Sequence, residues 1–153
     1  MPFISGISDE MVVADIFNWS PDAGRCISEW HEIVMRGESP LSTAQREFIA
    51  AYVSALNACA LCSGVHELIA ERFGIPSGTM QEAVDSVEQS SVEAKLKPLL
   101  SYAKKLTESP AKMVLADAKA VFDAGWDEQA LHDAINVTCM FNFMNRIVMG
   151  HGG

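Results

Sequence analysis

The chain has 153 residues, a formal net charge of −9, 49% hydrophobic residues and 20% charged residues. This length and composition predict one globular domain over residues 1–153 and exclude a disordered chain. The acidic balance excludes a nucleic-acid partner, because phosphate binding needs clustered basic residues and Lys104-Lys105 is the only adjacent basic pair.

The first part of the chain predicts two helices. We expect a loop over residues 1–8, and then a short helix that is capped by Ser8 or Asp9 and ends at Trp19. A second helix over residues 21–36 has a proline in its first turn and a glycine after its last. Its predicted apolar face consists of Cys26, Ile27, Trp30, Ile33 and Val34.

The next stretch contains the longest uncharged run. A helix begins after Ser42, and residues 48–65 contain no charge and approach the length of a membrane span. Polar residues and alanines interrupt this run, so we interpret it as a buried helix pair and expect no membrane contact. The N-terminus lacks the basic residues and apolar run of a secretory signal, so we expect a cytoplasmic location.

The remainder also predicts helices, and no stretch alternates as a strand would. Proline and glycine separate the helices, and Pro98 either kinks its helix or marks a later start. The sequence therefore predicts an all-α fold, with further helices over residues 77–87, 92–108, 110–124 and 127–149.

Two cysteines and a histidine share one stripe of the helix that contains them. At about 100° per residue, Cys62 lies about 60° from Cys59, and His66 returns to within roughly 20° of Cys59. Two thiols and an imidazole together are what thiol redox chemistry or soft-metal binding needs. Four cysteines in an intracellular-looking chain also indicate redox or metal groups, not a disulfide framework.

Glu47 can join this group only if the helix breaks. On one straight helix Glu47 and Cys59 would stand about 18 Å apart, at 1.5 Å per residue. We predict a break at Asn57, whose side chain would cap a new helix starting near Ala58. The cysteines would then lie in the first turn, where the helix dipole favours thiolate over thiol.

The spacing of these four residues resembles a known signature. Glu47, Cys59, Cys62 and His66 match the Glu-x11-Cys-x2-Cys-x3-His pattern of the alkylhydroperoxidase D and carboxymuconolactone decarboxylase-like superfamily. The flanking LSTAQREFIAAYVSALNACALCSGVH, a later GW and the ending FNFMNRI are similar to its peroxidase-related branch. The resemblance covers most of residues 21–149, and this chain departs from the best-known members by having Leu61 where they carry a histidine.

The resemblance implies a compact helical array with the cysteines at the N-terminal end of a central helix. It implies a thiol-dependent peroxidase without a cofactor or metal, with Cys62 as peroxidatic residue and Cys59 as resolving residue. His66 would be the base and Glu47 would hold or relay the proton. The implied partners are a peroxide, a dithiol or thioredoxin-like electron donor, and further copies of the chain in a trimer or hexamer.

Two other functions stay open at this point. Other members of the superfamily decarboxylate a small lactone, a reaction that typically does not depend on this cysteine pair. A zinc-binding structural module would use two thiolates, an imidazole and a carboxylate as ligands. Against the zinc module, one helical stripe rarely surrounds a tetrahedral ion.

The remaining polar residues receive structural interpretations. Cys26 and Cys139 are expected to be small core residues. His31 is expected on a wet helix face, His132 in the first turns of the last helix, and His151 in the tail. A second set lies on the long last helix, where amides need partners, and would line either the site rim or a subunit contact: Asn142, Asn145 and Arg146.

Overall fold

The computed structural model describes residues 2–7 and 12–153, and every regular element in this part of the chain is helical. The predicted all-α class is confirmed. The proposed caps Ser8 and Asp9 lie outside the described residues, and the single-domain organisation stays a prediction. The helices, in order, are α1 (Val13–Trp19), α2 (Pro21–Arg36), α3 (Thr43–Leu56), α4 (Ala60–Arg72), α5 (Thr79–Asp85), α6 (Lys97–Glu108), the 3₁₀ helix η1 (Pro110–Lys112), α7 (Leu115–Asp123) and α8 (Glu128–Gly150).

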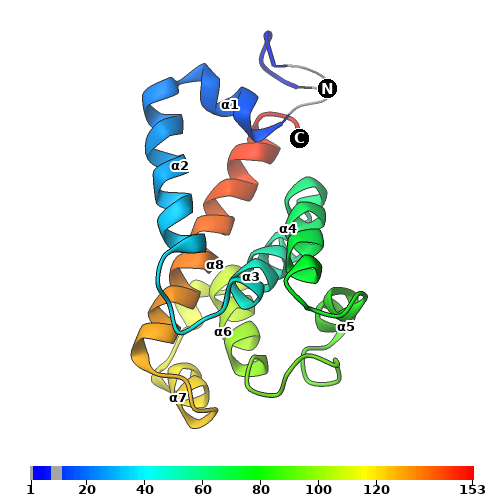
Figure 1. Cartoon of the computed structure of the whole chain (residues 1–153), viewed down its shortest axis with the longest axis vertical. Helices are drawn as coiled ribbons and strands as arrows, with labels where there is room; N and C mark the ends of the chain where they lie inside the picture. The colour runs from blue at the N-terminus through cyan, green and yellow to red at the C-terminus, as the bar shows by residue number, and fades with distance from the viewer. Residues whose placement is uncertain (1, 8–11) are drawn as a thin grey trace.

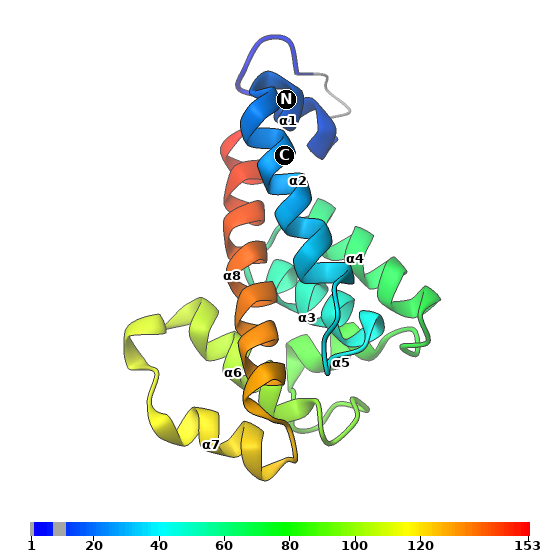
Figure 2. The same ribbon diagram turned by 60° about the vertical axis from the view of Figure 1, so that its left-hand side comes forward.

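The helices pack around α3, which lies in the middle of the molecule (Figure 1). α4 folds back along α3, and α5, α6 and α8 also pack on α3. α2 lies beside the long α8 in both views (Figures 1 and 2). Because neighbours surround α3, every residue from 46 to 54 is buried.

This burial explains the uncharged run. A helix covered on all sides has no need of a polar face, so its sequence loses the usual amphipathic pattern. No helix of the described residues is long and apolar enough to cross a membrane. The prediction of a buried helix pair over residues 48–65 holds for α3, but Leu61 and Val65 on α4 are 39% and 46% exposed, so the second helix of the pair is buried on one side only.

Local sequence signals set most helix ends. Ser42 Oγ accepts a hydrogen bond from the Gln45 N–H, and Gln45 Oε1 accepts one from the Ser42 N–H, which completes a capping box before α3. Asp127 accepts from the Ala130 N–H before α8. Pro98 lies in the first turn of α6, so the proline marks a late start and no kink.

The predicted apolar face of α2 is only partly buried. Ile27 and Val34 pack against the core, but Ile33 is 70% exposed and Cys26 is exposed. Cys139 on α8 is exposed as well, so the prediction that both cysteines are core residues is wrong. The reason is that α2 and α8 lie at the edge of the molecule, where each helix turns one side to solvent (Figure 2).

The N-terminal segment covers the end of α4. Ile7 and Ile16 form a small apolar cluster with Cys59, Cys62 and Val148. The Phe3 N–H donates a hydrogen bond of 2.9 Å to the His151 carbonyl, which ties this segment to the C-terminal end of α8. The two ends of the chain therefore enclose the cysteine pair from one side.

Candidate active site

The turn between α3 and α4 positions the cysteines. α3 ends at Leu56, and Ala58 takes a left-handed conformation with φ of 56°. Cys59 then directly precedes α4, and its N–H donates to the Ser54 carbonyl at 2.9 Å. The predicted break between Glu47 and the cysteines is present, and it folds α4 back along α3.

Asn57 does not have the role that we predicted for it. α4 begins at Ala60, two residues later than expected, and the side chain of Asn57 does not cap it. Instead Asn57 Nδ2 donates hydrogen bonds to Oδ1 of Asn142 at 3.2 Å and of Asn145 at 2.9 Å. The left-handed residue Ala58 reverses the chain and turns the Asn57 side chain toward α8.

The asparagines of α8 support this turn through hydrogen bonds. Asn145 is fully buried, and its Nδ2 donates a hydrogen bond to Ser54 Oγ at 2.9 Å. Asn142 Nδ2 donates to Thr107 Oγ1 and to the Thr138 carbonyl. Arg146 is exposed and donates to the Asn142 carbonyl. Two of the three polar residues on α8 therefore support the cysteine turn, and neither borders the pocket described below.

The two thiols lie against one another. Cys59 Sγ and Cys62 Sγ are 2.9 Å apart, and both residues are buried, with 3% and 7% of their surfaces exposed. The two thiols differ in what surrounds them. Cys62 borders a pocket, whereas Cys59 packs among Ile7, Ile16 and Val148.

The environment of Cys62 favours the thiol over the thiolate. Burial, followed by the hydrogen bond with Cys59, raises the pKa of Cys62 to about 12, although a hydrogen bond with Asn145 acts in the opposite direction. The expectation that the helix terminus favours a thiolate here is therefore wrong for Cys62. Loss of hydration at the buried sulfur is the largest influence on the pKa of this thiol. Any reaction of this thiol at neutral pH needs a base.

A carboxylate and an imidazole meet beside the cysteines. Glu47 is fully buried, and its Oε2 lies 2.5 Å from His66 Nδ1. Its other oxygen, Oε1, forms a 2.5 Å ion pair with Arg36 Nη2 from the last turn of α2. Three helices thus contribute one residue each to a chain of polar contacts.

Glu47 is held in its ionised form. Burial alone would raise the pKa of Glu47, but the hydrogen bonds and positive charge supplied by His66 and Arg36 outweigh it and lower the pKa. An ionised carboxylate at Nδ1 fixes the proton on that nitrogen, which leaves the lone pair on Nε2. His66 is therefore prepared to accept a proton through Nε2.

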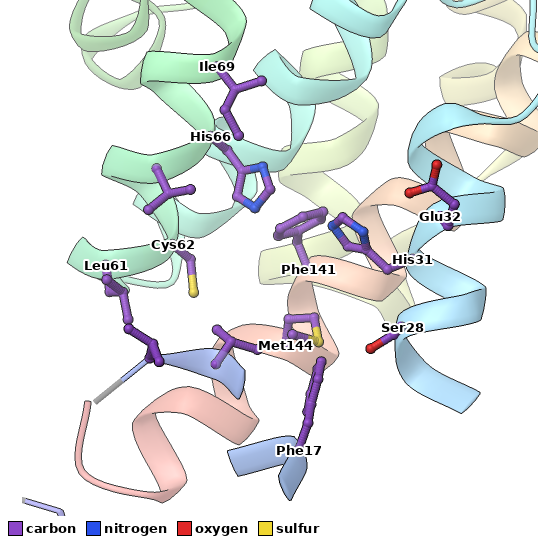
Figure 3. Close-up of a pocket in the computed structure, with 13 residues that line it drawn as sticks. Phe17, Ser28, His31, Glu32, Leu61, Cys62, His66, Ile69, Phe141 and Met144 are labelled. Carbon is purple, nitrogen blue, oxygen red and sulfur yellow. The ribbon is translucent and has the colours of Figure 1, made fainter. Parts of the chain in front are cut away.

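A pocket of about 530 Å³ lies in front of this group, between α4, α2 and α8 (Figure 3). Cys62, His66 and His31 supply polar atoms to it, together with Ser28 and Glu32 of α2. The rest of the lining is apolar: Val12, Val13, Phe17, Leu61, Val65, Ile69, Phe141 and Met144.

His31 belongs to this pocket, and its predicted position on a wet helix face is wrong. Its ring centroid lies 6.2 Å from that of His66, and both rings meet Phe141 edge to face. Burial and then the nearby His66 lower the pKa of His31. Helical periodicity places His31 on the polar side of α2, but the position of α4 makes that side a pocket wall.

Arg36 is the second residue of the candidate site that the sequence did not indicate. It lies eleven residues before Glu47, on another helix and beyond a turn, so no spacing rule connects the two. In contrast, the four predicted site residues, Glu47, Cys59, Cys62 and His66, are all brought together. Within residues 2–7 and 12–153, no group of three or more His, Cys, Asp or Glu side chains could hold a metal ion.

Sequence comparison places the chain in a family. The model of the carboxymuconolactone decarboxylase family matches residues 21–105, which is more than half of the chain and includes α2, α3 and α4. The chain belongs to this family. No curated protein has significant sequence similarity to this chain.

Solved structures with the same fold agree with this assignment. An uncharacterized peroxidase-related protein from Silicibacter sp. TM1040 has a TM-score of 0.84 and 25% identity, over 91% of this chain and 73% of that chain. An uncharacterized peroxidase-related protein from Ralstonia eutropha JMP134, with an alkylhydroperoxidase AhpD core, has a TM-score of 0.83 and 21% identity, over 89% and 72%. The debrominase Bmp8, solved with 2,3,4-tribromopyrrole, has a TM-score of 0.76 and 16% identity, over 88% and 71%.

Proposed function

We propose that this protein is a thiol peroxidase that reduces hydroperoxides through Cys62 and Cys59. The observation that carries the proposal is the arrangement of the pair: two thiols 2.9 Å apart, of which Cys62 borders the pocket. The family assignment and the peroxidase-related structures of similar fold support an enzyme of this kind.

The first step needs a base, since burial raises the pKa of Cys62 to about 12. His66 takes the thiol proton on Nε2, while Glu47 stabilises the imidazolium through Nδ1. The thiolate attacks the terminal oxygen of the hydroperoxide, so that an S–O bond forms and the O–O bond breaks. Cys62 becomes sulfenic acid, and the departing alkoxide takes up a proton to give the alcohol.

In the second step Cys59 acts as the resolving thiol. Its sulfur attacks the sulfenic sulfur, the S–S bond forms, and the hydroxyl group leaves with the Cys59 proton as water. The 2.9 Å separation means that little movement is required. An external dithiol then reduces the bridge and is itself oxidised to a disulfide.

The two other functions have less support from the geometry. A lactone decarboxylase would have no use for a thiol pair beside a base at the end of an apolar pocket. A zinc module would need three or more ligands around one point, and the described residues offer no such group. Self-association, a thioredoxin-like donor and a cytoplasmic location stay predictions from the resemblance and the sequence.

The test is peroxide-dependent bridge formation. The starting protein carries Cys26→Ser and Cys139→Ser, which removes the two exposed thiols and leaves only the pair in the motif. One equivalent of an alkyl hydroperoxide should link Cys59 to Cys62 within one chain, as shown by non-reducing peptide mapping. Cys59→Ser should stop at sulfenic acid, and Cys62→Ser should consume no peroxide.

Two results would contradict the proposal. The first is a parent protein whose thiols are unchanged by excess hydroperoxide. The second is sulfenic acid that forms at Cys59 when Cys62 is present. Turnover with several candidate dithiols, compared with the same variants, then identifies the class of electron donor.

A further inference from the structure

We infer that His31 stabilises the departing oxygen of the hydroperoxide, as a hydrogen-bond donor on the wall of the pocket opposite Cys62. The inference rests on the proposed peroxidase function and adds a residue that the four-residue signature does not contain. Figure 3 shows Cys62 on α4 and His31 on α2, on opposite sides of the pocket.

The direction of the reaction makes the opposite wall important. Displacement at oxygen is in line, so the departing oxygen leaves on the side away from the attacking sulfur. With Cys62 on α4 as nucleophile, the departing oxygen faces α2. Negative charge develops on that oxygen as the O–O bond breaks, and a donor placed there lowers the barrier.

His31 is suited to this task because its ring has free polar atoms. In the described part of the chain, no hydrogen bond involves either ring nitrogen of His31, whereas His66 Nδ1 is occupied by Glu47. A half-buried imidazole without a protein partner can give its N–H to a ligand in the pocket. The edge-to-face contact with Phe141 holds the ring in position.

The charges around His31 favour a neutral ring that donates a hydrogen bond. His66 and Arg36 face it as positive or potentially positive groups, while Glu47 and Glu32 partly offset them. Burial is the main reason that the pKa of His31 is lowered, and the charge of His66 adds to it. A neutral imidazole is an effective donor to a developing oxyanion when its position is fixed in advance. His66 keeps the separate task of base, because His66, unlike His31 in the described part of the chain, contacts a carboxylate through Nδ1.

The hydrogen bond should matter only when the leaving group is a strong base. An alkyl hydroperoxide releases an alkoxide, whereas a peracid of similar size releases a carboxylate that needs no such help. His31→Phe removes the donor and keeps an aromatic ring against Phe141. We expect it to slow sulfenic acid formation with an alkyl hydroperoxide by about 10²-fold and to change the rate with a peracid by less than about threefold.

Two further variants make the result specific. His31→Gln restores an N–H donor and should recover part of the rate with the alkyl hydroperoxide. Glu29→Gln, on the solvent side of α2, is the matched control and should keep both rates, because the Glu29 side chain is exposed and pairs with Arg25 on the same helix. Thermal unfolding of each variant shows whether the fold is kept.

Equal slowing of both oxidants by His31→Phe would overturn the inference, since it would indicate a structural effect on the site. Unchanged rates with both oxidants would overturn it as well. If the parent reacts with neither oxidant, the proposed function fails and the inference fails with it. If the parent reacts and His31→Phe keeps the parent's ratio of the two rates, the role of His31 is refuted while the proposed function stands.

Discussion

Replacement of His66 by glutamine tests how the buried thiol is activated. Glutamine keeps a polar side chain but cannot accept a proton at neutral pH. The structure gives the size of the problem: with a pKa of about 12, roughly 10⁻⁵ of Cys62 is thiolate at pH 7, because each pH unit below the pKa lowers that fraction tenfold. In the proposed mechanism, proton transfer from Cys62 to His66 Nε2 takes the place of this costly ionisation.

We expect His66→Gln to slow sulfenic acid formation at pH 7 by about 10²–10⁴-fold, the usual value of general-base assistance. Its rate should then rise about tenfold per pH unit as the thiolate fraction grows, whereas the parent depends less on pH above neutrality. The assay is single-turnover oxidation of Cys62 in the Cys26→Ser, Cys139→Ser background, followed by trapping of the sulfenic acid at several pH values. Glu47→Gln should slow the reaction less, because it acts through His66.

Two results would refute this reasoning. The parent's rate in His66→Gln across neutral pH would show that the thiol is activated without this base. A loss that persists unchanged at high pH, where the thiolate forms without help, would show that the substitution damages the site in another way.

Four further predictions follow from the burial and the contacts of individual residues. Glu47→Gln should remove a pH dependence of stability. Because the folded state lowers the pKa of Glu47 from its ordinary 4.5, the carboxylate stabilises the fold above that pH. The free energy of unfolding in urea should therefore fall for the parent, but not for the variant, as the pH falls below 4.5. Asn145→Ala should lower the free energy of unfolding by about 1–3 kcal/mol, since Ser54 and Asn57 lose a buried partner, and equal denaturation midpoints would contradict this. In a native iodoacetamide time course read by mass spectrometry, exposed Cys26 should react first and Cys62 before Cys59; a faster Cys59 would mean that the N-terminal segment does not cover it. Light scattering at micromolar concentration should report a mass above one chain, because Leu61, Val65 and Leu68 form an exposed apolar stripe on α4; a monomer would remove the oligomer prediction.

The spacing of Cys59, Cys62 and His66 predicted their shared stripe because an α-helix fixes which neighbours face one another. Local rules also gave the starts of helices at Ser42 and Asp127, where a side chain acts on residues next to it in the chain, but at Pro98 they left a kink and a later start open. The same rules failed at Asn57. A left-handed turn at Ala58 costs free energy, and the hydrogen bonds of Asn57 to Asn142 and Asn145 on α8 help to offset it.

The sequence by itself determined an all-helical fold, the break in the helix between Glu47 and the cysteines, and the four residues of the signature. The tertiary structure alone decided that Arg36 meets Glu47, that His31 faces the pocket, and that Cys26 and Cys139 are exposed. It also placed Cys62 in surroundings that raise the pKa of its thiol. Periodicity fixes the direction in which a side chain leaves its own helix, but burial and pKa depend on neighbours brought from distant parts of the chain.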